Sequence, residues 1–238
     1  MFPRAVLEAA KAHAKSAYPL ESCGLIVDER YIECVNEHET PAKHFRINQA
    51  VFDEVWEKQG PIRAVVHSHV HKPDYPSKLD MESQAAMGIP WGIVLVQSCY
   101  VCDPFWFGDD VPIAPLLERE FRWGVHDCYA LVRDWYRLNH GILMPNFPRE
   151  DEWWLNGQNM FEELYEEAGM VLIAGASLPE KRGDVIVGKI YSKVPNHCAV
   201  YEGNGLILHH LGNRLSERVP IEPWRKFIHK VFRHRKLL

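Results

Sequence analysis

Regularly spaced apolar residues predict the elements of the first half of the chain. Residues 3–17 carry apolar side chains at helical spacing among good helix formers, and Pro3 suits a first helical turn. Three apolar runs rich in β-branched residues predict strands at Cys23–Val27, 63–66 and 91–96. Helices interspersed with strands predict an α+β fold (mixed α/β).

The regular spacing of apolar residues is lost in the middle of the chain and returns after it. Residues 98–118 contain Asp109, Asp110 and three prolines, and they show no clear period. We expect a linker there, between one domain at 1–97 and a second at 119–238.

The second half predicts one helix followed by strands. Asp127 precedes an amphipathic run, so it is expected to cap a helix that carries Cys128 in its first turn. Strands are predicted at 183–187, 197–201 and 206–209. The last two form a hairpin around the Glu-Gly-Asn-Gly turn at 202–205.

One group of polar residues has the spacing of a metal site. His67 and His69 flank Ser68 at the end of a predicted strand. Ser77 follows after seven residues and Asp80 after two more. Residues two apart on a strand project to the same side, so the two imidazoles face one way. Ser77 and Asp80 alone would fit a capping box, but a capping box leaves the buried imidazole pair unexplained.

This spacing, with Glu21 on an earlier apolar segment, resembles the JAMM (MPN-type) zinc metallopeptidases. The resemblance implies an MPN-like β-sheet with flanking helices, and a Zn²⁺ ion held by His67, His69 and Asp80. It also implies that Glu21 accepts a proton from the attacking water and that Ser77 hydrogen-bonds the developing oxyanion.

A second group has the residue types of a thiol hydrolase. Backbone N–H groups and the dipole at a helix start lower the pKa of a cysteine such as Cys128. His197 and His209 fall on neighbouring strands of the predicted hairpin. The three residues therefore form a candidate set of nucleophile, base and orienting group. His126 and His210 are possible substitutes, although alternation puts His210 on the opposite face from His209.

Residues 119–210 resemble the NlpC-type cysteine peptidases, papain-like enzymes that cut peptidoglycan stem peptides. The likeness lies in Trp-Gly before Asp-Cys at a helix start, in Arg-Gly-Asp before a strand, and in His-x3-Tyr-x-Gly-Asn-Gly before a second histidine. It implies Cys128 as nucleophile, His197 as base and His209 as orienting residue. Phe121 stands where the family usually has a tyrosine, and Tyr129 replaces a serine.

Composition narrows the function classes. The net charge is −5 and the sequence pI about 6.2, so no basic field exists to hold nucleic acid or anionic lipid. The sequence has no stretch long and apolar enough for a membrane span, and it lacks a secretory signal pattern at its start. We therefore expect the chain to be made and kept soluble in the cytoplasm. Six cysteines in this length do not suggest a disulfide scaffold.

The succession of the two motifs resembles the tail tip assembly proteins of long-tailed bacteriophages. That resemblance implies other tail tip proteins as partners, a peptidoglycan stem peptide or a tail protein as substrate, and a place at the virion tail tip after assembly. Two function classes stay open. The first is a bifunctional hydrolase, and the second is a structural or chaperone-like tail component with one or both sites vestigial.

Overall fold

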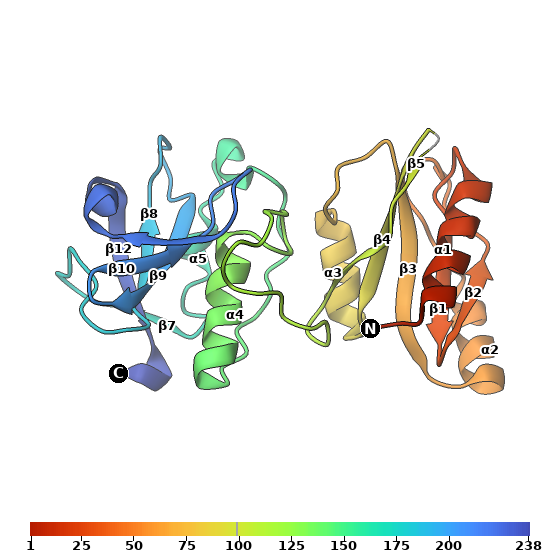
Figure 1. Ribbon diagram of the computed structural model, residues 1–238, viewed down its shortest axis with the longest axis horizontal. Coiled ribbons are helices and arrows are strands. Elements are labelled where there is room, and N and C mark those ends of the chain that lie inside the picture. The colour runs from red at the N-terminus through yellow and green to blue at the C-terminus, as the bar shows by residue number, and fades with distance from the viewer. Residues whose placement is uncertain (99) are drawn as a thin grey trace. The chain divides into compact units, whose positions relative to one another are not determined.

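The computed structural model describes residues 1–98 and 100–238. The chain forms two compact units, Met1–Pro112 and Ile113–Leu238 (Figure 1). Each unit has its own sheet and its own hydrophobic core, in agreement with the predicted mixed α/β architecture. Among the described residues, no helix is long and apolar enough to cross a membrane.

The first unit is built on a six-stranded sheet in the order β2-β1-β3-β4-β5, with β6 also paired to β4. The β3 and β4 strands are parallel, whereas the other neighbours are antiparallel. The strands are β1 (Cys23–Val27), β2 (Arg30–Cys34), β3 (Ile62–Val70), β4 (Trp91–Gln97), β5 (Tyr100–Val101) and β6 (Phe105–Phe107). The helices are α1 (Arg4–Ala17), α2 (Gln49–Gln59) and α3 (Lys78–Met87).

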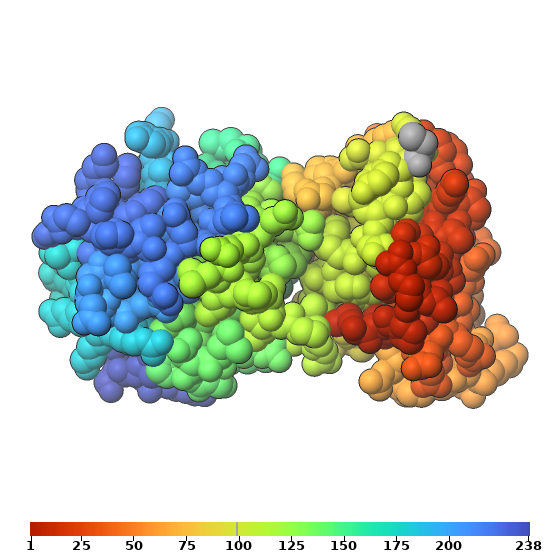
Figure 2. Space-filling view, in the orientation of Figure 1, coloured from red at the N-terminus to blue at the C-terminus, as the bar shows by residue number. Residues whose placement is uncertain are grey.

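Helix α1 covers one face of this sheet, and its atoms are red in Figure 2. Its buried face, Val6, Ala10 and Ala14, packs against alternate residues of β3 and β4. Side chains along a strand point alternately to the two faces of the sheet. Since Ala64, Val66 and Val70 of β3 face α1, the odd-numbered residues between them point away from it. The opposite face of β3 is therefore free to carry polar side chains next to α3.

The first sheet extends into the segment predicted as a linker. Strands β5 and β6 lie within residues 98–118, and Trp91 on β4 pairs with Phe107 on β6. The division between the units follows Pro112. Short strands of two or three residues give no readable alternation, so the irregular sequence of this stretch did not predict them.

The second unit packs helix α4 against a six-stranded sheet in the order β11-β10-β9-β8-β12-β7. Its strands are β7 (Met170–Leu172), β8 (Val185–Gly188), β9 (His197–Gly203), β10 (Leu206–His209), β11 (Glu217–Pro220) and β12 (Ile228–His234). Its helices are α4 (Cys128–His140), α5 (Met160–Glu163) and the 3₁₀ turns η1 (Trp153–Asn156), η2 (Glu222–Phe227) and η3 (Arg235–Leu237).

The predicted hairpin and helix of this unit are confirmed. Strands β9 and β10 pair antiparallel, and Leu208 lies opposite Val200. Trp135 and Tyr136 of α4 are fully buried against this sheet, together with Val200 and Leu208. The packing fixes the start of α4 close to the start of β9, where the candidate thiol and imidazoles lie.

Candidate functional site

His67 and His69 project from β3 on the face opposite α1. Both side chains are buried, with 1% and 4% of their surface exposed. His67 lies opposite Cys23 of β1 and beside Ile93 of β4, in the middle of the sheet. The sequence placed the histidines at the end of a strand predicted over 63–66, and the structure continues β3 through both of them to Val70.

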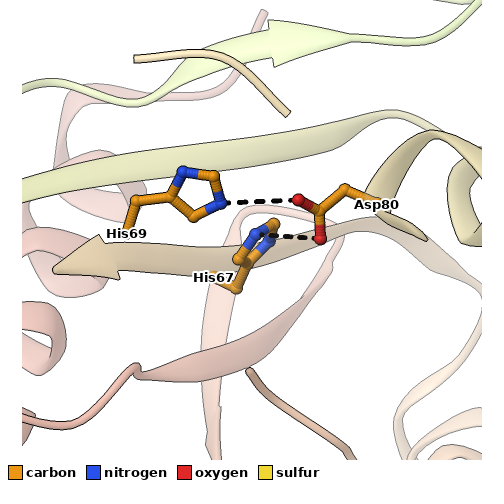
Figure 3. Close-up of side chains that lie close together, drawn as sticks. All are labelled: His67, His69 and Asp80. Atoms are coloured by element: carbon orange, nitrogen blue, oxygen red, sulfur yellow. Dashed lines mark ion pairs between the residues drawn. The ribbon is translucent and has the colours of Figure 1, made fainter. Parts of the chain in front are cut away.

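Asp80 reaches the two imidazoles from the first turn of α3 (Figure 3). Its Oδ1 lies 3.4 Å from His67 Nε2, and its Oδ2 lies 3.4 Å from His69 Nε2. The three ligand atoms lie within 4.8 Å of one another. The structure therefore brings together the three predicted ligands, which come from a strand and from the following helix.

The surroundings of these residues fit a metal ion. Within the part of the chain that the structure describes, Nδ1 of the buried His67 has no hydrogen-bond partner, and Nε2 has only the 3.4 Å contact with Asp80. Leaving a buried polar group unpaired is costly, and coordination of a cation would remove that cost. His69 Nδ1 lies 3.1 Å from the carbonyl oxygen of Pro73, a contact that aims Nε2 at Asp80. Phe45 stacks on His67 at a centroid distance of 4.4 Å.

Ser77 and Asp80 form the capping box that the sequence left as an alternative. The Ser77 amide donates to Asp80 Oδ2 at 2.8 Å, and the Asp80 amide donates to Ser77 Oγ at 3.1 Å. The Ser77 hydroxyl donates to Asp80 Oδ2 at 2.7 Å. The cap and the His-His-Asp cluster thus coexist, because the cap orients the carboxylate that faces the imidazoles.

The charge state of Asp80 follows from these contacts. Burial by itself would raise the pKa of this carboxyl group. His67, His69 and the Ser77 hydroxyl outweigh burial and hold the pKa far below its usual range. Asp80 is therefore a carboxylate, the form that binds cations.

Glu21 lies just before β1 and is 2% exposed. The Ser68 amide donates to the Ser22 carbonyl oxygen at 3.0 Å, which continues the pairing of β1 with β3. By alternation Glu21 then shares the sheet face of His67 and His69. Its Oε1 lies 2.6 Å from Lys72 Nζ, an ion pair that the sequence did not reveal.

In the second unit, Cys128 is the first residue of α4 and Asp127 is its N-cap, as predicted. Asp127 Oδ1 accepts from the Ala130 amide at 2.9 Å, and Oδ2 accepts from the Gly124 amide at 3.0 Å. Arg149 donates to both carboxylate oxygens, at 2.7 and 2.9 Å. Burial opposes the charge on Asp127, but Arg149 and these hydrogen bonds lower the pKa of its carboxyl group.

The Cys128 thiol is surrounded by groups that favour its thiolate. A hydrogen bond from Cys198 is the largest cause, and His197 adds a hydrogen bond and a favourable charge. Together they lower the pKa of Cys128 to about 5, although burial opposes the shift. Burial and the Cys128 thiolate raise the pKa of Cys198 in turn. Sequence reasoning missed Cys198, whose neighbour His197 was the only signal for it.

The imidazoles of His197 and His209 extend the line of contacts that begins at the Cys128 thiol. His197 Nε2 lies 3.2 Å from His209 Nδ1, which leaves His197 Nδ1 as the nitrogen available to Cys128. Burial first, and then the charge of His197, lower the pKa of His209 to about 3, so His209 is neutral. Glu217 Oε1 lies 3.5 Å from His209 Nε2 and sits directly opposite His209 in the β10–β11 pairing. No motif in the sequence indicated Glu217.

The alternative histidines lie outside this chain of contacts. His210 Nε2 donates to the Arg214 carbonyl oxygen at 3.0 Å, and Phe121 packs edge-on against the His210 ring. Burial lowers the pKa of His126 to about 4, with Arg119 and Arg122 adding to the effect. The structure therefore joins Cys128 to His197 and His209, the set chosen from the sequence.

Comparison with known proteins agrees with this division into two domains. Residues 3–107 match the family described as prokaryotic homologues of the JAB domain, and residues 118–233 match the NlpC/P60 family. The fold and the two sites thus define a class of proteins in which a JAB-like domain precedes an NlpC/P60 domain.

Two phage proteins are similar along most of their length. Tail tip assembly protein K of Escherichia phage lambda is 39% identical over 183 residues, covering 75% of this chain and 85% of the relative. Tail tip assembly protein K of Escherichia phage N15 is 31% identical over 242 residues, covering 96% of this chain and 94% of the relative. The chain belongs to the family of phage tail tip assembly protein K.

Among solved structures, a protein from Desulfitobacterium hafniense is similar at 23% identity with a TM-score of 0.38. The match covers 46% of this chain and 84% of that protein.

Proposed function

We propose that this tail tip assembly protein is a bifunctional hydrolase. The first unit would act as a zinc-dependent peptidase or isopeptidase, and the second as a cysteine endopeptidase. The observation that carries the proposal is the linked set of Cys128, His197 and His209, in which a thiol of lowered pKa meets two coupled imidazoles. The buried His-His-Asp cluster supports the metal-dependent half.

In the first unit, His67, His69 and Asp80 would hold Zn²⁺ through two imidazole nitrogens and a carboxylate oxygen. When bound, zinc supplies Lewis-acid chemistry at this cluster. Glu21 would hold the proton taken from the attacking water, since its buried carboxylate shares the sheet face of the two histidines. Ser77 orients Asp80, and its hydroxyl would have to leave Asp80 Oδ2 in order to donate to an oxyanion.

In the second unit, the Cys128 thiolate would attack the carbonyl carbon of a peptide bond. His197 would give its proton to the departing amine, and the resulting thioester would be hydrolysed by water with His197 as the base. His209 would hold the His197 ring through the contact between Nε2 and Nδ1. Neutral His209 can act in this way because it needs only a hydrogen bond and no charge.

The names of the relatives point to the setting. Both relatives are tail tip assembly proteins, so we propose that this chain acts in the host cytoplasm during assembly and at the virion tail tip, with other tail tip proteins as partners. Its substrate would be a peptidoglycan stem peptide or a tail protein. Cleavage of the first would open the cell wall locally, and cleavage of the second would mature the tail.

One observation favours a second function, that of an assembly component with a vestigial zinc site. Lys72 holds Glu21 in an ion pair and also donates to the Lys43 carbonyl oxygen. While the ion pair holds, the Glu21 carboxylate is not free to take a proton from water. If this pair persists with a metal bound, the first unit would bind metal without cutting a bond.

Zymography on purified cell walls, together with digestion of purified tail proteins, tests both functions. The samples are the wild type, His67→Ala with His69→Ala, and Cys128→Ser. His71→Ala and Cys102→Ser serve as matched controls, because they remove a histidine or a cysteine outside the two sites. We expect each site variant to lose one cleavage and the controls to keep both. If wild type cuts neither walls nor tail proteins, the assembly function replaces the enzymatic one.

Metal analysis separates binding from turnover in the first unit. Wild type and Glu21→Gln should each retain one equivalent of zinc, whereas the double histidine variant should retain none. We expect the Glu21→Gln protein to lose metal-dependent cleavage. Full cleavage by zinc-loaded Glu21→Gln would contradict the assignment of Glu21 as proton acceptor.

A further inference from the structure

An apolar pocket opens beside Cys128 in the second unit. Its cavity volume is about 60 Å³, which is room for several water molecules. Its walls combine core residues beneath α4 with aromatic side chains from just before α4 and from the segment between α4 and β7. The aromatic lining includes Trp123, Phe147, Trp153, Trp154 and Phe161.

The charged and amide groups on the pocket wall are already paired with the protein. The Arg149 guanidinium donates hydrogen bonds to the Asp127 carboxylate, to Asn146 Oδ1 and to the Phe147 carbonyl oxygen. The Asn196 side chain bonds the backbone of Ile190 through both of its polar atoms. Most of the donors of these two side chains are therefore engaged within the protein. Turning Arg149 toward a substrate carboxylate would break its buried ion pair with Asp127, which is costly.

The Cys128 thiol is the reactive group on this wall. A substrate whose carbonyl carbon meets Cys128 thus carries its nearest side chains to the mouth of an apolar pocket. Burying a leucine- or phenylalanine-sized side chain there would favour binding by at least about tenfold. A small or charged side chain would gain little, since it would leave the aromatic walls without a partner.

We infer that the thiol site takes polypeptide substrates with a bulky apolar side chain next to the scissile carbonyl. This inference rests on the proposed cysteine hydrolase, and it names the substrate class of that site. A stem peptide offers alanine, glutamate and a diamino acid, which are small or charged. The pocket therefore favours a protein segment, such as part of a tail protein, over the cell wall.

A series of N-acetyl amino acid p-nitrophenyl esters tests the preference on the full-length protein. The Cys128 sulfur attacks the ester carbonyl carbon, a C–S bond forms and the C–O bond to p-nitrophenolate breaks. Water then hydrolyses the thioester, which releases the N-acetyl amino acid and returns the thiol. The esters carry glycine, alanine, glutamate, leucine or phenylalanine, and each rate is divided by the rate of the same ester with free cysteine.

We expect leucine and phenylalanine esters to react at least about tenfold faster than the glycine ester, from the free energy of burying the side chain. Cys128→Ser should abolish the enzymatic rate for every ester. Equal corrected rates for all five esters, or a preference for glutamate, would overturn the pocket assignment and leave the thiol hydrolase intact. Loss of every rate in wild type would instead count against the proposed hydrolase.

A variant that fills the pocket provides a matched comparison. Ala168 is buried on the pocket wall, so Ala168→Met should reduce the leucine-to-glycine rate ratio toward one. Leu155→Ala is the control, because Leu155 is exposed and its neighbour Trp154 lines the pocket. Iodoacetamide is small and should alkylate Cys128 at equal rates in both variants and in wild type. A preserved ratio in folded Ala168→Met would contradict the inference.

Binding can also be measured without turnover. The indole N–H resonances of Trp153 and Trp154, assigned with tryptophan-to-phenylalanine variants, should shift when N-acetyl-phenylalaninamide is added to the ¹⁵N-labelled protein. N-acetyl-glycinamide at the same concentration should leave them in place. If neither compound shifts these resonances, the pocket is not a side-chain site, whatever the ester rates show.

Discussion

The buried Asp127–Arg149 ion pair should stabilise the fold around the start of α4, where the thiol site lies. Asp127 is 2% exposed and Arg149 is 7% exposed, and two hydrogen bonds of 2.7 and 2.9 Å join them. Asp127→Asn removes the negative charge, although its remaining oxygen can still accept from the Ala130 amide and cap α4. The new amide group would then point its N–H groups at the donors of Arg149 and Gly124.

The size of the effect follows from the burial of both partners. Removing one partner of a buried ion pair leaves an uncompensated charge and costs about 3–5 kcal/mol. Asparagine can still cap α4, so Asp127→Asn should avoid the further loss of about 1 kcal/mol of folding free energy that Asp127→Ala would cause. For a domain of this size, we expect the unfolding temperature of the second unit to fall by about 10–20 °C.

Differential scanning calorimetry of the full-length protein provides the measurement. The transition of the second unit should shift, and the transition of the first unit, identified by its response to EDTA, should stay in place. Glu54→Gln is the control, because its ion pair with Lys58 is exposed to solvent and should contribute little to stability. A double-mutant cycle of Asp127→Asn with Arg149→Met should give a coupling free energy of about 3 kcal/mol.

The dependence on pH has a definite sign. The folded-state pKa of Asp127 lies below its unfolded value, so its stabilising effect is present above about pH 4 and is lost as the pH falls through the folded pKa. The difference between wild type and Asp127→Asn should therefore shrink in strong acid. A coupling below about 1 kcal/mol at neutral pH, or a difference that grows on acidification, would refute the reasoning.

Three further predictions concern other parts of the molecule. Alkylation of Cys128 by iodoacetamide should rise with pH around a midpoint near 5, and Cys198→Ala should move that midpoint upward, as read by mass spectrometry. EDTA should lower the unfolding temperature of the first unit alone, and zinc at 100 times its dissociation constant should restore about 2.7 kcal/mol. Gly24→Ala should destabilise the first unit by about 1–3 kcal/mol in urea unfolding, since its Cβ would meet the Tyr31 ring and lie 2.5 Å from the Ile32 carbonyl oxygen.

Local spacing in the sequence was enough to predict the elements that carry the chemistry. Helix α1, strand β1, the Asp127 cap and the β9–β10 hairpin all follow from signals within a few residues. Such signals survive in a single sequence because a cap or a turn depends on neighbours in the chain. The short strands β5 and β6 give too little alternation to be read in this way.

The same locality explains which site residues could be chosen from the sequence. His67 and His69 share a strand face through alternation, and Cys128 follows directly after a capping residue. Ser77 and Asp80 had two interpretations, a cap or a part of the metal site. Only the structure shows that Asp80 completes the cap and also faces the two imidazoles, because the first turn of α3 meets the face of β3 that points away from α1.

The order of the residues was sufficient to predict a His-His-Asp cluster with the donor atoms of a metal site, and a thiol at a helix start with two histidines on a hairpin. The tertiary structure decided which further groups reach them. Lys72 pairs with Glu21 from 51 positions away in the chain, Cys198 meets Cys128, and Glu217 lies opposite His209 across a strand pair. The pocket beside Cys128 likewise joins residues from many segments. These contacts depend on how sheets and helices pack. Packing between segments that are distant in the chain produces no periodic pattern in the sequence, so it cannot be predicted from residue spacing.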